Sequence, residues 1–261
     1  MPLITLTTDL GTVDHYVSAV KATILRQLDN ANIVDISHDI PPFNIIHAAF
    51  VLKNVYQEFP QGSIHIIGVN AESNEDTNHI AVYANGHYFI GTDNGIFSLL
   101  LDVKPDKIVE ITATRDSDNE NFPIKDVFAK TACHIARGGK LEVIGTPISQ
   151  FSKESAKLEA LHDKNNIRGS IIHIDHYGNA ITNISQRLFK DVAKERAYSI
   201  NLGSKEHYSI NSIKRKYKEV AAGDAIALFI STGLLTISLN NGSAAALMGL
   251  HINDTVRIEF K

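Results

Sequence analysis

The first segment of the chain carries a carboxylate in a position suited to ligand binding. Leu3–Thr7 is a compact apolar run that predicts a strand, and Thr8-Asp9-Leu10-Gly11 follows it before a helical pattern begins near Asp14. In open α/β sheets, ligands bind beyond the carboxyl ends of the strands. Asp9 is therefore a candidate to accept hydrogen bonds from both hydroxyls of a ribose. The alternative is that Asp9 caps the turn or the helix.

A second possible use of this region is metal binding. Hard divalent ions favour carboxylate oxygens, and imidazole binds several transition metals. The candidate ligands are Asp9, Asp14, His15, His38 and Asp39. Their spacing matches no common metal signature, so no metal is predicted, and a metal site stays an alternative to ribose binding.

Several common catalytic motifs are absent from the sequence. It has no Gly-rich loop that ends in Lys-Ser or Lys-Thr, and no dinucleotide fingerprint follows the first predicted strand. No serine lies in a glycine-flanked elbow between a strand and a helix, and no histidine pair has the spacing of a helical zinc site. The residues by themselves indicate an α/β protein with a polar ligand site.

The N-terminal part of the chain alternates between strand-like and helix-like segments. Strands are predicted at Leu3–Thr7, Ile33–Ile36, Ser63–Val69, Ile80–Tyr83, His87–Ile90 and Lys107–Ile111, and helices at Asp14–Leu28, Phe43–Phe59 and Val127–Ala136. Asn85-Gly86 predicts a tight hairpin between two of these strands. The alternation indicates an α/β domain over residues 1–152, with a mostly parallel sheet covered by helices on both faces.

The C-terminal part has a different pattern. Residues 153–167 are polar and are interpreted as a linker, and beyond them the helical pattern largely vanishes. Short β-like runs lie at Ser170–Ile174, Ala180–Ile184, Ala197–Leu202, Ala225–Ile230, Leu234–Leu239 and Thr255–Phe260. This pattern predicts a small all-β, barrel-like or sandwich domain over residues 168–261.

Composition narrows the classes of partner and compartment. The 261 residues include 25 Lys+Arg and 29 Asp+Glu, a net charge of −4, which gives no electrostatic case for nucleic acid or an anionic membrane. The single cysteine, Cys133, cannot form an intrachain disulfide, which fits a reducing compartment. The N-terminal residues do not resemble a signal peptide, and no apolar run is long enough for a membrane span. We therefore expect a soluble, cytoplasmic protein.

Five segments carry a more specific pattern. They are Thr8–Gly11 with Asp14, Ile36–Phe43, Tyr88–Gly95, Ile174–Asn179 with Thr182–Ile184, and Ser231–Leu235 leading into Asn240–Ala245. Together, and in this order, they resemble the family of S-adenosylmethionine (SAM) hydrolases that form adenosine, which also contains fluorinating and chlorinating enzymes. The resemblance covers both halves of the chain. It implies an α/β domain followed by a small β-barrel, in a homotrimer.

The resemblance also implies a ligand site between the N-terminal domain of one subunit and the C-terminal domain of its neighbour. Asp9 would hold the ribose hydroxyls, and Phe43 would form an apolar wall. The other implied substrate-binding residues are Asp14, His15 and Tyr16 near the methionine or ribose, Asp175, Asn179 and Ser231 with the adjacent Thr232 at the methionine end, and Leu239, Asn240 and Asn241 at the adenine edge.

The sequence departs from the family at the residues that activate water. The hydrolases carry an Asp, an Arg and a His, and the aligned positions here are Asn70, Thr77 or Asn78, and Pro123. Asn70 is able to position a water but cannot accept its proton at neutral pH. The activity implied is cleavage of SAM by water to adenosine and L-methionine, through displacement at the 5′ carbon, without a further cofactor.

Three hypotheses follow from this departure. A hydrolase would need a replacement base, for which Glu72, Asp76 and His79 are the candidates. A second possibility is a protein that binds SAM or adenosine without turnover. The third is a halide-using adenosyl transferase, against which Ile124 stands, because its side chain is expected to fill the halide pocket.

Overall fold

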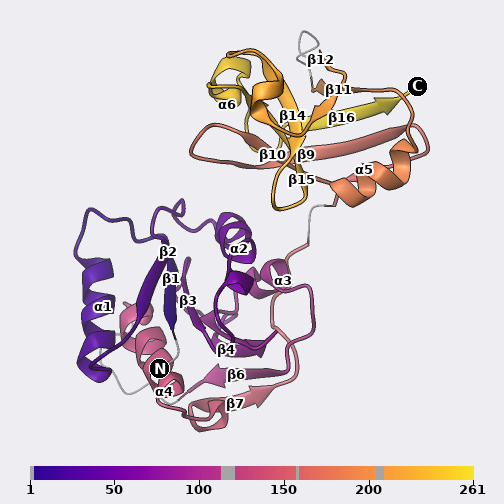
Figure 1. The fold of residues 1–261 in the computed structure, drawn as a ribbon. Helices are drawn as coiled ribbons and strands as arrows, with labels where there is room; N and C mark the ends of the chain where they lie inside the picture. Colours follow the sequence, from indigo (N-terminus) through magenta and orange to yellow (C-terminus); the bar gives the residue numbers. More distant parts are fainter. Residues whose placement is uncertain (1–2, 113–120, 157–158, 204–208) are drawn as a thin grey trace. The chain divides into compact units, whose positions relative to one another are not determined.

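The structure is a computed structural model that describes residues 3–112, 121–156, 159–203 and 209–261. It divides into two compact units, Met1–Ala156 (unit 1) and Lys157–Lys261 (unit 2) (Figure 1). The predicted linker, 153–167, spans this division. Residues 157–158 of the linker lie outside the described ranges, and Leu161–His162 within it forms a short strand, β8. No helix in the described ranges has the length and apolar character needed to cross a bilayer.

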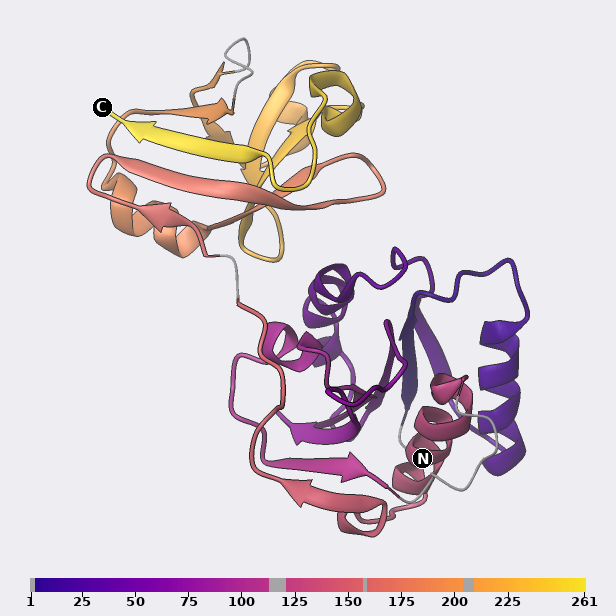
Figure 2. The same cartoon turned by 180° about the vertical axis from the view of Figure 1, so that it is seen from behind.

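Unit 1 is built on a seven-stranded sheet with the order β2-β1-β3-β5-β4-β6-β7. The strands are β1 (Ile4–Thr8), β2 (Ile33–Ser37), β3 (Ile64–Gly68), β4 (His79–Ala84), β5 (His87–Thr92), β6 (Lys107–Ile111) and β7 (Gly145–Ile148). β2, β1, β3 and β5 are parallel, and the pairs β5–β4, β4–β6 and β6–β7 are antiparallel. The opposite arrows of β6 and β7 can be followed in Figure 2. The α/β class is confirmed, and the sheet is mixed rather than mostly parallel.

The change from parallel to antiparallel pairing has a local cause. Asn85 and Gly86 have φ angles of 53° and 79°, the positive values that a tight two-residue hairpin requires. They turn β4 directly back into β5, so this pair is antiparallel. The hairpin predicted from the sequence is therefore confirmed.

Helices cover both faces of this sheet. The helical segments are α1 (Tyr16–Gln27), α2 (Ile45–Lys53), the 3₁₀ turn η1 (Tyr56–Glu58), α3 (Ile96–Leu100), the π-helical turn η2 (Ile124–Phe128), α4 (Ala129–Ala136) and the 3₁₀ turn η3 (Leu141–Val143). Figure 1 shows α1 and α4 on one face and α2 and α3 on the other. Each layer has its own buried cluster against the sheet, one containing Val20 and Phe128 and the other Leu52 and Phe97.

Unit 2 is a nearly closed, barrel-like sheet, as expected. Its order is β12-β11-β16-β9-β10-β15-β14-β13, with β8 paired to β9. The strands after β8 are β9 (Asn166–Ile174), β10 (Ala180–Ser185), β11 (Tyr198–Leu202), β12 (Ser209–Ile210), β13 (Ile213–Lys214), β14 (Ala225–Phe229), β15 (Leu234–Leu239) and β16 (Thr255–Phe260). Unit 2 also contains α5 (Gln186–Ala193), α6 (Ala244–Met248) and the 3₁₀ turn η4 (Tyr217–Glu219), which the sequence interpretation omitted.

A chain of polar side chains is buried inside unit 1. His65 on β3 is completely buried, with its Nδ1 2.7 Å from Oγ1 of Thr5 and its Nε2 3.2 Å from Nδ1 of His87. Burial, together with the neighbouring charge of His87, lowers the pKa of His65 to about 3. Burial lowers the pKa of His87 as well. Both imidazoles are therefore neutral in the folded protein at neutral pH.

This burial predicts a loss of stability in acid. Because folding lowers the pKa of His65 from 6.5 to about 3, its stabilising contribution is complete above pH 6.5 and is lost as the pH falls towards 3. The free energy of unfolding is expected to fall by roughly 4–5 kcal/mol across that window. Denaturant unfolding at several pH values should show a weaker pH dependence for His65→Gln, whereas the exposed-site control His162→Gln should follow the wild type. An unchanged pH dependence in His65→Gln would contradict this account.

Candidate functional site

Asp9 lies just beyond the carboxyl end of β1. Its Oδ2 accepts hydrogen bonds from the backbone N–H groups of Phe43 (2.9 Å) and Asn70 (3.2 Å). Both donor residues have positive φ angles, 64° and 47°, which turn their N–H groups towards the carboxylate. No hydrogen bond from a described residue reaches Oδ1, so among the described residues this oxygen keeps its acceptor sites unused. The Phe43 side chain is 73% exposed beside this carboxylate, as an apolar wall would be.

The topology of unit 1 places Asp9 beside a reversal of the strand order. β1 lies between β2 and β3, and the chain crosses from β1 to β2 through α1 on one face and from β2 to β3 through α2 on the other. The strand order thus reverses between β1 and β3. Open α/β sheets bind ligands beyond the carboxyl ends of the strands at such a reversal. Asp9 and Asn70 follow these two strands, so the structure brings them together where a ligand is expected.

The segment that contains Asn70 is held through its main chain. Asn94 Nδ2 donates to the Asn70 carbonyl oxygen (3.1 Å), and Thr92 Oγ1 donates to that of Ala71 (2.7 Å). The Asn70 side chain is exposed. Asn94 was not predicted as a site residue, although it belongs to the segment Tyr88–Gly95 that carried part of the resemblance. Its role here is to position the Asn70 backbone.

The residues predicted at the start of α1 form an aromatic group. His15 stacks on Tyr16 with a ring separation of 4.5 Å, and Tyr16 packs edge-on against Phe122 at 5.6 Å. Asp14, just before them, is exposed. This group therefore places three aromatic rings and a carboxylate around the start of α1.

Ile124 packs against the carboxyl ends of β1 and β3. It is buried, and a Cβ built on Gly68 at the end of β3 would lie only 2.6 Å from its Cδ1. The same Cβ would lie 3.1 Å from Cγ2 of Thr8. Ile124 therefore fills the space against the ends of β1 and β3, next to Asp9. Pro123, at one of the positions aligned with the hydrolytic residues, is buried and precedes η2.

The other aligned positions and the candidate bases lie after β3. Thr77 is buried and accepts through Oγ1 from the Asn74 N–H (3.2 Å), within a tight turn that Asn78 follows. His79 Nε2 lies 2.9 Å from the Ala71 carbonyl oxygen. Because a carbonyl only accepts, that nitrogen carries the proton and is not a base. Glu72 and Asp76 are both exposed.

The metal hypothesis finds no support in the described part of the chain. No three or more His, Cys, Asp or Glu side chains are placed there to hold an ion. His38 is buried, and its Nδ1 lies 2.7 Å from Oγ1 of Thr8, while Asp39 is exposed. The proposed ligands therefore do not converge.

In unit 2, the turn between β9 and β10 brings Asp175 and Asn179 together. Oδ1 of Asp175 accepts from the backbone N–H groups of Tyr177 (3.0 Å) and Asn179 (2.9 Å), and Oδ2 accepts from Asn179 Nδ2 (2.8 Å). The two side chains therefore rigidify this turn. Asn179 is buried, and its amide and the Asp175 carboxylate are held in fixed orientations.

This turn packs on the segment that follows β15. Gly178 has a φ of 79°, its carbonyl accepts from the Ala245 N–H (2.9 Å), and a Cβ on it would collide with Ser243 Oγ. The predicted adenine-edge residues precede this contact: Leu239 and Asn240 are buried, and Asn241 is exposed with a φ of 60°. These three residues therefore lie in the segment that leads into the contact with the Asp175 turn.

Ser231 and Thr232 lie elsewhere in unit 2. They form the loop between β14 and β15, where Thr232 Oγ1 accepts from the Leu234 N–H (3.4 Å). Leu239 is at the opposite end of β15, roughly 17 Å from the first residue of that strand, Leu234, at ~3.3 Å per residue. Within one chain, Ser231 and Thr232 are thus not brought together with the Asp175 group.

Comparison with known families gives matches over both units. The model for the SAM hydroxide adenosyltransferase N-terminal domain matches residues 4–145, and that for the C-terminal domain matches residues 169–257. An (R)-S-adenosyl-L-methionine hydrolase from Methanocaldococcus jannaschii is 29% identical, over 99% of this chain and 96% of its own length. One from Thermus thermophilus is 27% identical over 96% of each chain. A fluorinase from Nocardia brasiliensis is 21% identical, over 99% of this chain and 97% of its own.

Solved structures show the same fold. An uncharacterised conserved protein from Thermotoga maritima superposes with a TM-score of 0.89, at 24% identity over 98% of this chain and 99% of its own. A conserved hypothetical protein from Thermus thermophilus gives 0.77, at 27% identity over 99% of this chain and 100% of its own. The family matches extend through the α/β unit and the barrel-like unit alike. This chain belongs to the SAM hydroxide adenosyltransferase family.

Proposed function

We propose that this protein binds SAM at the carboxyl edge of the unit 1 sheet and cleaves it with water to adenosine and L-methionine. The observation that carries the proposal is the Asp9 carboxylate, fixed through Oδ2 by two backbone N–H groups, while Oδ1 keeps its acceptor sites unused among the described residues. A ribose diol offers two adjacent hydroxyl donors, and an ionised carboxylate is a pure acceptor that pairs with them. The names of the curated relatives support the same substrate.

The reaction suits a site that mainly positions its reactants. Water attacks the 5′ carbon opposite sulfur, the new C–O bond forms as the C–S bond breaks, and the sulfonium leaves as a neutral thioether. The leaving group needs no proton, and the attacking water gives up one proton to solvent or to a base. Holding two reactants in line contributes up to about 7–11 kcal/mol in favourable cases. In this proposal Asn70 positions the water.

Glu72 is the base that we expect to take the proton. It lies two residues after Asn70 and is exposed, whereas Asp76 lies in the tight turn closed by Asn74 and Thr77. Glu72→Gln should lower kcat by about 10²-fold or more with little change in KM, because a base acts on the chemical step rather than on binding. The matched variant Asp76→Asn should stay close to wild type in a single-turnover assay. If Asp76→Asn loses activity and Glu72→Gln does not, Asp76 is the base. If neither variant loses activity, neither residue is the base.

Unit 2 is proposed to contribute the methionine and adenine contacts. The group made of the Asp175–Asn179 turn and the segment Leu239–Asn241 is joined where Gly178 contacts Ser243 and Ala245, just after that segment, which supports this role. In the trimeric arrangement that the resemblance implies, a neighbouring subunit supplies this group. Sedimentation velocity of the full chain tests the trimer, and a monomer at assay concentrations would contradict it.

The direct test is chromatography of purified protein incubated with SAM. Adenosine and methionine formed in equal amounts, and lost with Asp9→Ala, would support the proposal. If calorimetry shows SAM binding but no adenosine forms, the chain is a binding protein. The second candidate is favoured by the lack of the water-activating Asp, Arg and His at the aligned positions, which are Asn70, Thr77 or Asn78, and Pro123. Halide use is the third outcome, and the packing of Ile124 against Gly68 argues against it.

A further inference from the structure

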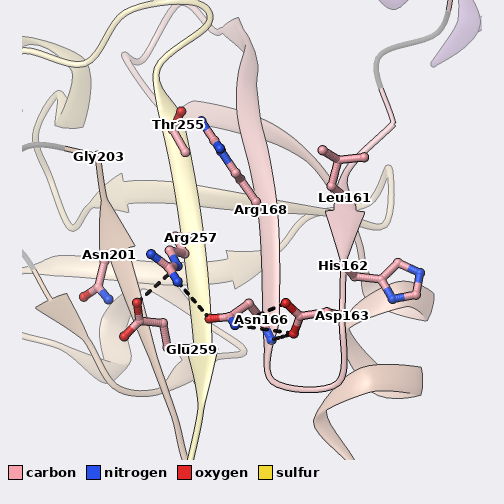
Figure 3. Close-up of a pocket in the computed structure, with 10 residues that line it drawn as sticks. All are labelled: Leu161, His162, Asp163, Asn166, Arg168, Asn201, Gly203, Thr255, Arg257 and Glu259. Atoms are coloured by element: carbon pink, nitrogen blue, oxygen red, sulfur yellow. Dashed lines mark hydrogen bonds and ion pairs between the residues drawn. The ribbon is translucent and has the colours of Figure 1, made fainter.

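A groove of about 820 Å³ on unit 2 lies outside the site proposed above (Figure 3). It runs across the outer face of β8, β9, β16 and β11. None of the residues that line it belongs to the Asp9 group, the Asp175 turn or the segment after β15. The volume is in the range of small-molecule sites rather than single-ion sites. The groove is therefore a separate candidate for binding.

The strand register aligns its central side chains in one row. Leu161 on β8 lies opposite Arg168 on β9, Arg168 lies opposite Arg257 on β16, and Arg257 lies opposite Asn201 on β11. Residues directly opposite on paired strands project from the same face. Two arginines placed opposite each other repel, and this costs stability unless a negative charge offsets them.

Arg257 has such partners within the groove. Its Nε lies 3.1 Å from Oε1 of Glu259, and its Nη2 donates to Oδ1 of Asn166 (3.3 Å). The Asn166 amide donates in turn to the Asp163 carboxylate (3.4 Å). These contacts, drawn as dashed lines in Figure 3, fix Arg257 and match its charge.

Arg168 is left out of this network. It is exposed, and no hydrogen bond or ion pair joins it to any residue in the described ranges. Figure 3 shows its side chain running towards Thr255, away from the group formed by Asn166 and Asp163. Within the described ranges its planar guanidinium therefore has all its donors available for a flat bidentate acceptor. At the adjoining end of the row, Leu161 is 71% exposed and leaves an apolar surface uncovered.

We propose that this groove binds a small carboxylate with a short apolar body. The carboxylate pairs with the Arg168 guanidinium and the body lies on Leu161, which lies opposite Arg168 in the register. Arg257 is paired with Glu259, and the Asp163 carboxylate accepts from Asn166, so a single guanidinium, that of Arg168, remains for the ligand, and one carboxylate matches its charge. Thr255 adds a hydroxyl donor beside the arginine.

Calorimetric titration of the full chain with valerate tests this proposal. We expect saturable binding that weakens by about tenfold or more in Arg168→Gln, because a charge-assisted bidentate pair is lost. The control Arg187→Gln removes an arginine that is 93% exposed on the same unit, and it should bind as the wild type does. Thermal unfolding of Arg168→Gln, expected to match the wild type, confirms that this outward-facing variant is folded.

Two further probes separate the parts of the ligand. Valeramide has the same apolar body without the charge and should not bind, and Leu161→Ala should weaken valerate binding but not acetate binding. The proposal is overturned if valerate does not saturate, if Arg168→Gln and Arg187→Gln bind equally, or if valeramide binds as well as valerate. Tighter binding of inorganic phosphate than of valerate would overturn the assignment to a carboxylate.

Discussion

Replacing Asp9 with alanine is expected to lower the kcat/KM for adenosine formation from SAM by about 10²–10⁴-fold. Hydrogen bonds to a charged group each contribute roughly 1.5–3 kcal/mol, and a ribose diol makes two of them. The carboxylate is fixed in place before a ligand arrives, because the N–H groups of Phe43 and Asn70 already hold Oδ2. Little ordering therefore remains to be done when the diol binds.

The effect of Asp9 on binding has to be separated from its effect on folding. Asp9→Asn keeps the shape and one acceptor oxygen, so it should retain more thermal stability than Asp9→Ala while still losing most of the affinity for adenosine in calorimetry. Asp39→Asn removes an exposed carboxylate after the neighbouring strand β2 and serves as the control. If Asp9→Asn binds adenosine as tightly as the wild type, Asp9 is a structural residue and not the ligand anchor.

A second large effect is expected in the opposite direction. Asn70→Asp should raise the rate of adenosine formation by about 10²-fold, because it places a proton acceptor where the wild type has an amide. The substitution should not disturb the backbone, since aspartate tolerates the left-handed region almost as well as asparagine does at φ 47°. The negative charge of Asp9 nearby disfavours ionisation of the new carboxyl group, which makes it a better base near neutral pH.

Asn70→Gly is the matched variant for this experiment. Glycine keeps the positive φ and the N–H donor to Asp9 but removes the side-chain amide. If Asn70 positions the attacking water, Asn70→Gly should lower kcat and leave adenosine affinity unchanged. Equal rates for the wild type, Asn70→Asp and Asn70→Gly would show that the side chain at this position does not contact the reacting water.

The main strands were predictable because their signals are local. Runs such as Lys107–Ile111 and Leu234–Leu239 are rich in apolar and β-branched residues and of strand length, and the structure has strands with these bounds. The Asn85-Gly86 hairpin was also local, since two adjacent residues set the turn. These features need no information from distant parts of the chain.

The missed elements are short or depend on distant partners. β7 contains Pro147 and is an edge strand that forms only by pairing with β6, so its sequence alone reads as a loop. α3 and α6 have five residues each, too few for a helical period to show. α5 had a usable signal, because Ser185 caps it through a hydrogen bond from the Leu188 N–H (3.1 Å).

The candidate site was predictable only in part, for a similar reason. Asp9 follows a strand end, which is visible in the sequence. Its partners are backbone N–H groups of Phe43 and Asn70, 34 and 61 residues away, and their positive φ angles have no clear sequence signal at Phe43. Backbone donors carry no residue-type signature, so only coordinates reveal them.

The way Asp9 is held also bears on how such a protein can diverge. Every residue except proline supplies a backbone N–H, so the hydrogen bond to Asp9 does not depend on the side chain at position 70. The requirement at this position is a tolerance of positive φ, which asparagine, aspartate and glycine share. The position of the Asp9 carboxylate is therefore independent of the side chain at position 70, and that side chain can change while the carboxylate stays where it is.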